Sequence, residues 1–255
     1  MNKVYFVGAG PGDPKLITVR GKELVETADL ILYAGSLVPK EMLVWAKPEA
    51  VLQDTSGMTL EEIIDSIKKG WERNKLVVRL HTGEPSLYGA TYEQFNALDE
   101  LNIPYEVVPG VTAAFLCASR LKKELTVPEK TQTVIFTRVK GRTPVPENED
   151  LEVLSKIGAS MAIYLSVSKI SEVAKTLSQH YGPEAPIVVG YRLGWPGEIV
   201  IEGTVKDIGE KVRKAGISKH AIILVGPCLE KESASSTRSR LYSKDFSHGY
   251  RKSGS

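Results

Sequence analysis

Three short loops rich in glycine and proline carry the residues of this 255-residue chain that are most suited to hold a small ligand. Glycine lets the backbone approach a ligand or another loop closely, and proline fixes the direction of a turn. Each loop follows an apolar segment that is typical of a buried strand, and loops at the carboxyl ends of parallel strands meet at one rim of a sheet. Their shared placement predicts a binding site. The loops are residues 7–14 (VGAGPGDP), 79–89 (RLHTGEPSLYG) and 108–113 (VPGVTA).

The first loop does not match the common phosphate-binding patterns. A dinucleotide fingerprint requires glycine at position 13, where this chain has Asp13, and a carboxylate repels a pyrophosphate. A Walker loop requires Gly-Lys-Ser/Thr, which the sequence does not contain. We therefore expect the backbone to approach something other than a phosphate. The alternative is a tight turn between a strand and a helix that binds no ligand.

Apolar segments alternate with helical patterns through the first half of the chain. Thr59 and Glu62 have the spacing of a capping box, so a helix should begin there. Alternating strands and helices indicate an α/β domain with a mostly parallel sheet. The pattern predicts strands at residues 3–7, 29–34, 76–80 and 105–109, and helices at about 18–28, 59–70, 91–101 and 111–121.

A second α/β unit follows a charged break at residues 122–130. Two of its predicted strands succeed each other directly, which favours a mixed sheet. We expect a first domain at 1–121, a second at 122–231 and a polar, basic tail at 232–255 with too little apolar content to fold. The predicted strands are 132–137, 160–165, 186–191, 198–203 and 220–225, and the predicted helices begin near 149, 168 and 205.

The composition excludes several classes of protein. A content of 42% hydrophobic and 25% charged residues is typical of a globular protein. Residues 1–229 hold 27 basic and 28 acidic side chains, which gives no electrostatic footprint for nucleic acid. Two cysteines and four histidines without ligand spacing predict no metal site and no disulfide framework. No apolar run approaches the ~18 residues of a membrane span, so we expect a cytoplasmic protein with no membrane partner.

Four stretches, in order along the chain, resemble the tetrapyrrole (corrin/porphyrin) methyltransferase family. They are VGAGPGDPKLIT at 7–18, ADLILYAGSLV at 28–38, VVRLHTGEPSLYGA at 77–90 and VVPGVTAA at 107–114. The resemblance extends over about residues 3–229, and the segments 33–37 and 137–147 are most similar to family members that methylate precorrin-4 at C-11. The family usually has Gly-Asp-Pro where this chain has Gly83-Glu84-Pro85. We expect any contact of this acid to survive at a shifted position.

The resemblance implies a fold, a cofactor and an assembly. It implies two α/β domains with an S-adenosylmethionine cleft between them, which differs from the usual Rossmann-like methyltransferase, and it implies a homodimer. By the same resemblance, cofactor contacts map to the three loops and to strand ends of the second domain. The implied cofactor-binding residues are Gly10, Pro11, Gly12, Thr82, Gly83, Glu84, Leu87, Thr112 and Ala113, and in the second domain Tyr164, Leu165, Leu193 and Ala221.

Methyl transfer from a sulfonium is an in-line displacement in which a protein contributes orientation and exclusion of water. Because the acceptor would be an electron-rich ring carbon, no strong base is required. Asp13 is the candidate to accept a ring proton or to bind a pyrrole N–H; alternatively its carboxylate anchors its own loop. The many carboxylates of a tetrapyrrole favour Arg138, Lys140 and Arg142 as substrate-binding residues, against the alternative of a solvated charged surface. Cobalt would arrive inside the substrate.

Three other interpretations remain open from the sequence. The first is a sister tetrapyrrole methyltransferase that acts at another ring position or on uroporphyrinogen III. The second is a non-catalytic α/β regulator that binds adenosylmethionine. The third is an ordinary single-domain methyltransferase, because the spacing of Gly8, Gly10 and Gly12 also suits the first motif of that class. The second α/β unit and the two further glycine loops argue against the last.

Overall fold

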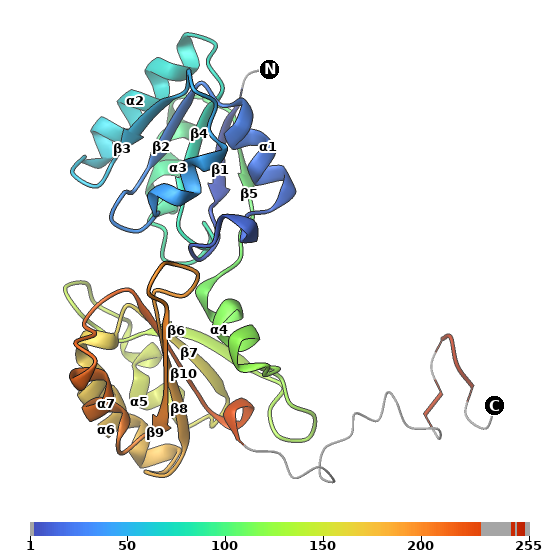
Figure 1. Cartoon of the computed structure of the whole chain (residues 1–255), viewed down its shortest axis with the longest axis vertical. Helices are drawn as coiled ribbons and strands as arrows, with labels where there is room; N and C mark the ends of the chain where they lie inside the picture. Colours follow the sequence, from blue (N-terminus) through green and yellow to red (C-terminus); the bar gives the residue numbers. More distant parts are fainter. Residues whose placement is uncertain (1–2, 231–245, 248, 253–255) are drawn as a thin grey trace. The chain divides into compact units, whose positions relative to one another are not determined.

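The computed structural model describes residues 3–230, 246–247 and 249–252, and it divides the chain into two units (Figure 1). One unit is Met1–Leu116 with Arg192–Ile199, and the other is Cys117–Tyr191 with Val200–Ser255. Each unit contains a five-stranded sheet with helices, as the α/β prediction requires. Most of the tail predicted from residue 232 onward lies outside the described residues.

The first sheet is entirely parallel and has the strand order β3-β2-β4-β1-β5. Buried apolar residues dominate its three central strands, whereas the edge strand β3 exposes Val51 and Leu52. The parallel pairing places all five carboxyl ends at one rim of the sheet. The strands are β1 (Val4–Gly8), β2 (Leu30–Tyr33), β3 (Val51–Asp54), β4 (Val77–His81) and β5 (Tyr105–Val108).

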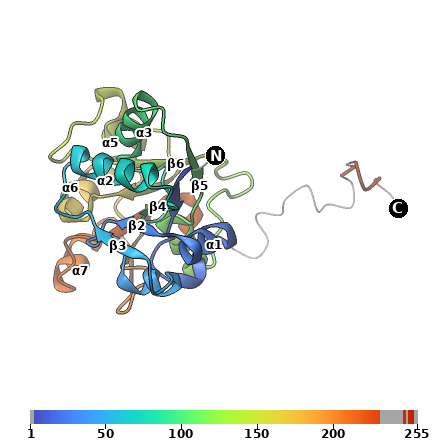
Figure 2. The ribbon, with the colours of Figure 1, turned by 90° about the horizontal axis from the view of Figure 1, so that it is seen from above.

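Helices cover both faces of the first sheet (Figure 2). On one face α1 (Val19–Thr27) packs with Val7, Ile31 and Leu80; on the other α2 (Leu60–Glu72) and α3 (Thr91–Glu100) pack with the opposite side chains of the same strands. Thr59 and Glu62 form the predicted capping box at the start of α2. The alternating strand pattern therefore builds two apolar layers, one on each face.

The second unit has a mixed sheet with the order β6-β7-β10-β8-β9. β6 and β7 are parallel, whereas β10 runs antiparallel to both β7 and β8. Its core lies between this sheet and the helices, where Ile163, Leu177 and Ile223 are fully buried. The elements are β6 (Val134–Arg138), α5 (Leu151–Ser155), β7 (Ser160–Tyr164), α6 (Ile170–His180), β8 (Pro186–Tyr191), β9 (Ile199–Thr204), α7 (Ile208–Lys214) and β10 (Ala221–Val225).

The division of the chain into units differs from the sequence prediction in two ways. The division between the units falls inside α4 (Ala113–Leu121), after Leu116, rather than after residue 121. The segment Arg192–Ile199, which was predicted in the second domain, groups with the first unit. The physical reason is a long-range contact, because the indole Nε1 of Trp195 donates to the carbonyl oxygen of Pro11 at 3.0 Å.

Candidate active site

The three predicted glycine loops meet at the carboxyl rim of the first sheet and pack against one another. Gly10 and Gly83 exchange two backbone hydrogen bonds, of 3.2 and 2.8 Å between nitrogen and oxygen. A Cβ on Gly110 would lie 2.1 Å from the carbonyl oxygen of Gly83, and a Cβ on Gly8 would lie 2.6 Å from the Cα of Gly110. The loops therefore depend on glycine for contact with each other.

Backbone conformation gives a second reason for glycine in these loops. Gly10 has a φ of 77° and Gly83 a φ of 62°, both in the left-handed region that side chains disfavour. At Gly83 an added Cβ would find nothing closer than the Cα of Thr112 at 3.8 Å, so the constraint there is conformational. Gly12 (φ 143°) is constrained by space, because its Cβ would lie 2.1 Å from the Trp195 ring.

The carboxylate of Glu84 joins the second loop to the third. Its Oε2 accepts from the backbone N–H of Gly110 at 2.8 Å. Its Oε1 accepts from the backbone N–H and the hydroxyl of Ser86, at 2.9 and 2.8 Å. Hydrogen bonds to a carboxylate are stronger than those between neutral groups. Glu84 thus fixes the relative position of the two loops, where resemblance alone implied a cofactor contact.

The Asp13 carboxylate contacts its own loop. Its Oδ1 accepts from the backbone N–H of Lys15 at 2.9 Å and caps the short 3₁₀ turn Pro14–Leu16. This is the anchoring role that the sequence left open beside proton transfer. Gly194 packs against the same turn, because its Cβ would lie 2.8 Å from the Asp13 nitrogen.

Segment 192–199 adds a fourth glycine-rich turn to the first unit, and sequence reasoning assigned it elsewhere. Leu193 is buried, and Trp195 holds the first loop through Pro11. The glutamate Glu198 accepts from the backbone N–H of Gly194 at 2.7 Å and closes the turn. The run Gly-Trp-Pro-Gly at 194–197, shortly after the strand that ends at Tyr191, was an available signal of the same kind as the other three loops.

The remaining candidates of the second and third loops differ in burial. Thr112 is buried and its carbonyl oxygen accepts from the Phe115 and Leu116 amides at the start of α4. Thr82 is exposed, and Leu87 and Ala113 are half-buried. The loops therefore leave Thr82 exposed and keep the apolar side chains of Leu87 and Ala113 partly accessible.

In the second unit, Tyr164, Leu165 and Ala221 lie at the same end of two neighbouring inner strands, β7 and β10. β10 is antiparallel to β7, so Ala221 begins where β7 ends. Leu165 is 68% exposed and has a φ of 53°, a left-handed conformation unusual for leucine. The Tyr164 ring makes an edge contact with Phe136, with centroids 6.1 Å apart.

The predicted substrate-binding cations lie in and after β6. Arg138 donates from Nη1 to the Thr143 carbonyl oxygen at 3.3 Å and from Nη2 to the Pro144 carbonyl oxygen at 2.6 Å. Its guanidinium therefore braces its own loop. Lys140 and Arg142 are exposed on that loop.

Beneath the second loop, the central strand β4 buries two ionisable side chains. Arg79 and His81 are 5% and 6% exposed. Burial, together with the charge of Arg79, lowers the pKa of the His81 imidazole to about 3. Burial also lowers the pKa of Arg79 to about 10. His81 is therefore neutral at pH 7.

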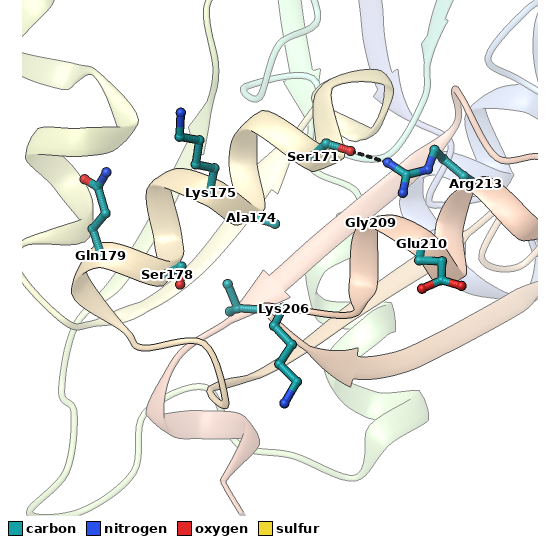
Figure 3. Close-up of a pocket in the computed structure, with 10 residues that line it drawn as sticks. Ser171, Ala174, Lys175, Ser178, Gln179, Lys206, Gly209, Glu210 and Arg213 are labelled. Carbon is teal, nitrogen blue, oxygen red and sulfur yellow. Dashed lines mark hydrogen bonds between the residues drawn. The ribbon is translucent and has the colours of Figure 1, made fainter.

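A further groove of about 580 Å³ lies between α6 and α7 of the second unit (Figure 3). Small residues, Ala174 and Gly209, leave space between the helices. Lys175 and Lys206 point away from each other (Figure 3), and the Lys206 ammonium pairs with Glu184 at 2.6 Å. The groove contains none of the predicted site residues.

Within the described residues no group of three or more His, Cys, Asp or Glu side chains is placed to hold a metal ion, and no helix is long and apolar enough to cross a membrane.

Comparison with known proteins decides the family. The sequence profile described as Tetrapyrrole (Corrin/Porphyrin) Methylases matches residues 3–209. The chain belongs to this family.

Among the tetrapyrrole methylases, similar relatives cover nearly all of the chain. A cobalt-precorrin-4 C(11)-methyltransferase of Methanocaldococcus jannaschii is 50% identical over 98% of this chain and 96% of its own length. A precorrin-4 C(11)-methyltransferase of Pseudomonas aeruginosa is 44% identical over 97% and 98%. A uroporphyrinogen-III C-methyltransferase of Methanocaldococcus jannaschii is 33% identical over 88% and 95%.

Solved structures of tetrapyrrole methylases share the fold. A cobalt precorrin-4 methyltransferase described as a cobalamin biosynthetic enzyme has a TM-score of 0.87 and 44% identity, covering 90% of this chain and 96% of that one. A uroporphyrin-III C-methyltransferase from Thermus thermophilus, complexed with S-adenosyl homocysteine, has a TM-score of 0.73 and 26% identity, with coverage of 89% and 99%.

Proposed function

We propose that this protein transfers a methyl group from S-adenosylmethionine to C-11 of cobalt-precorrin-4, to give cobalt-precorrin-5 in cobalamin biosynthesis. The observation that carries the proposal is 50% identity to a cobalt-precorrin-4 C(11)-methyltransferase over 98% of the chain. The relative that acts on uroporphyrinogen III has 33% identity, which favours the precorrin-4 activity over that sister activity.

The glycine loops fit the proposed cofactor. Gly8, Gly10, Gly83 and Gly110 bring three stretches of backbone together at spacings that a Cβ would fill or strain. We assign cofactor binding to these loops, with Pro11, Thr82, Leu87, Thr112 and Ala113 as contact residues, and to Tyr164, Leu165 and Ala221 of the second unit. When bound, adenosylmethionine supplies an electrophilic methyl carbon on a sulfonium.

The chain's own residues orient the reactants and exclude water. Glu84 sets the distance between the second and third loops through Gly110. We assign Asp13 to positioning of the first loop, since its Oδ1 caps the turn that follows. Proton transfer by Asp13 is the alternative outcome of the test described in the Discussion.

The acidic groups of the substrate require cations. We assign Lys140 and Arg142 to the propionate and acetate carboxylates, and Arg138 to holding their loop, since two of its donors already bond loop carbonyls. An arginine can meet a carboxylate with two parallel hydrogen bonds, whereas a lysine meets it as a point charge.

We also propose a homodimer, which would bury about 1,200–2,000 Å² if its interface is of standard size. Exposed apolar side chains such as Phe115, which is 53% exposed on α4, support the proposal. Sedimentation should show a dimer at micromolar concentration, and a monomer alone would contradict it.

The activity is tested with labelled methyl donor and three acceptors: cobalt-precorrin-4, precorrin-4 and uroporphyrinogen III. Label should enter cobalt-precorrin-4 at the highest kcat/KM. A higher kcat/KM with uroporphyrinogen III would favour the sister activity. Binding of adenosylmethionine without transfer to any acceptor would favour a regulator.

A further inference from the structure

The second glycine loop has a supporting layer beneath it that the proposed function does not use. Arg79 lies on β4 with its side chain on the face covered by α2 and α3, and it is 5% exposed. A buried guanidinium costs stability that an apolar side chain would not. The hydrogen bond that Arg79 makes therefore bears on why a guanidinium is buried at this position.

That contact leads through one glutamine to the loop. The Nε of Arg79 donates to Oε1 of Gln94 at 3.2 Å. Gln94 lies on α3 and is 4% exposed, and its Nε2 donates in turn to the carbonyl oxygen of Ala90 at 3.0 Å. An amide side chain both accepts and donates, so Gln94 can join a cation to a carbonyl.

Ala90 ends the loop in a strained conformation. Its φ of 48° and ψ of 37° are left-handed, and Tyr88 two residues earlier has a φ of 53°. Non-glycine residues keep such conformations only where surrounding contacts determine them. One other such contact is the hydroxyl of Thr91, which donates to the Pro85 carbonyl oxygen at 3.1 Å.

Resting on the proposed cofactor role of this loop, we propose that Arg79 and Gln94 form a buried relay that positions residues 83–90 for adenosylmethionine. Both are positioning residues, because they act through Ala90 and not on the cofactor. Arg79 fixes the side-chain conformation of Gln94. Gln94 holds Ala90, at the end of the loop before α3, so that Gly83 and Leu87 keep their positions at the carboxyl rim of the sheet.

Gln94→Glu separates positioning from folding. A carboxylate still accepts from Arg79, and its charge neutralises the buried guanidinium, but it cannot donate to Ala90. The melting temperature should stay within about 2 °C of wild type or rise. The Kd for S-adenosylhomocysteine, measured by calorimetry on the full chain, should increase about tenfold.

Leu98→Ala is the matched control on the same helix. Leu98 is fully buried in the apolar core between the sheet and α3. This variant should lower the melting temperature by several degrees while the Kd stays within about twofold. Unchanged affinity in folded Gln94→Glu overturns the relay, and so does an equal loss of affinity in Leu98→Ala.

Amide hydrogen exchange without ligand gives a second readout. Amides of residues 83–90 should exchange faster in Gln94→Glu, and those of β1 should not. Should Gln94→Glu not fold, Gln94→Met removes both hydrogen bonds without adding a charge. It also removes the acceptor of the buried Arg79 guanidinium, so its melting temperature should fall, whereas the expectations for the Kd and for loop exchange stay the same. Unchanged exchange in the loop overturns the relay.

The failure of the relay and the failure of the proposed function give different results. A wild-type chain that binds no S-adenosylhomocysteine contradicts the proposed function, and loop exchange then decides the relay alone. A wild-type chain that binds, together with weak binding by Gly83→Val and normal binding by Gln94→Glu, overturns only the relay.

Discussion

The carboxylate of Glu84 and the backbone N–H of Gly110 are 2.8 Å apart, although 26 positions separate them in the sequence. This bond joins two of the three glycine loops, and the other carboxylate oxygen fixes Ser86. Glu84→Gln replaces one accepting oxygen by an NH₂ group that faces an N–H donor. We expect the Kd for S-adenosylhomocysteine to increase about tenfold, because one charge-assisted hydrogen bond is lost.

Glu93→Gln is the control for this change. Glu93 is an exposed glutamate on the first turn of α3. Its replacement should leave cofactor affinity within about twofold. Equal affinities of Glu84→Gln and wild type would show that the bond to Gly110 does not position the site.

Gly110→Ala tests the packing of the loops. The new Cβ would lie 2.1 Å from the carbonyl oxygen of Gly83, so the second and third loops must separate. Forced overpacking costs about 1–3 kcal/mol of folding free energy, and cofactor affinity should decrease by more than tenfold. Gly57→Ala, where an added Cβ meets nothing within 4 Å, should change neither the folding free energy nor the cofactor affinity. Calorimetry and thermal unfolding measure both effects, and normal affinity in folded Gly110→Ala would contradict the close packing.

Two substitutions distinguish the roles of Asp13. Asparagine is as good a cap as aspartate, whereas alanine accepts no hydrogen bond. If the carboxylate positions its loop, Asp13→Asn keeps most of kcat while Asp13→Ala loses both cofactor affinity and kcat. We predict that result. A large fall of kcat in Asp13→Asn with unchanged cofactor affinity would show proton transfer instead.

Substrate recognition should depend on charge in the loop after β6. Lys140→Ala with Arg142→Ala should raise the KM for the tetrapyrrole about tenfold or more and make it less sensitive to salt. Arg142→Lys should recover only part of the loss, because an ammonium cannot make the two-pronged contact. Lys175→Ala, which removes an exposed cation from α6, should leave KM unchanged. Unaltered kinetics in the double variant would show that other residues bind the carboxylates of the substrate.

The buried His81 predicts a pH dependence of stability. Its folded pKa is about 3, below the ordinary value of 6.5, so the folded state holds the imidazole neutral. Its contribution is complete above pH 6.5 and is lost as the pH falls toward 3. In that range it should lower the free energy of unfolding by about 1.4 kcal/mol per pH unit. Denaturant unfolding at pH 7, 6 and 5 should show a steeper decline for wild type than for His81→Gln. Equal declines in the free energy of unfolding for wild type and His81→Gln would contradict this role of His81.

The parallel first sheet and its rim of loops followed from local patterns. Short apolar runs that alternate with amphipathic helices and end in Gly/Pro turns predict strands, helices and loop positions without tertiary information. The edge strand β3 gave no such signal, since its apolar run is only Val51 and Leu52, which are about half exposed and are followed by Gln53 and Asp54. Its pairing with β2 is a tertiary property.

The parts of the site that sequence reasoning missed depend on contacts between distant residues. Trp195 reaches Pro11 across 184 positions, which moves its segment into the first unit. Arg138 was predicted to bind substrate because of its charge, but the turn at Thr143 and Pro144 places two carbonyls within its reach. For Arg138 the residue type suggested the chemistry, whereas the path of the chain decided the partner; for Trp195 the sequence carried no prediction.

Methylation at C-11 is tested by the position of the new methyl group in the product. The full chain is incubated with cobalt-precorrin-4 and adenosylmethionine labelled with ¹³C in its methyl group, and the product is examined by mass spectrometry and by ¹³C NMR. We expect one added methyl group, attached to ring carbon C-11, at a rate that Gly110→Ala reduces. A product methylated at another ring carbon, or no labelled product from a chain that binds S-adenosylhomocysteine, would contradict it.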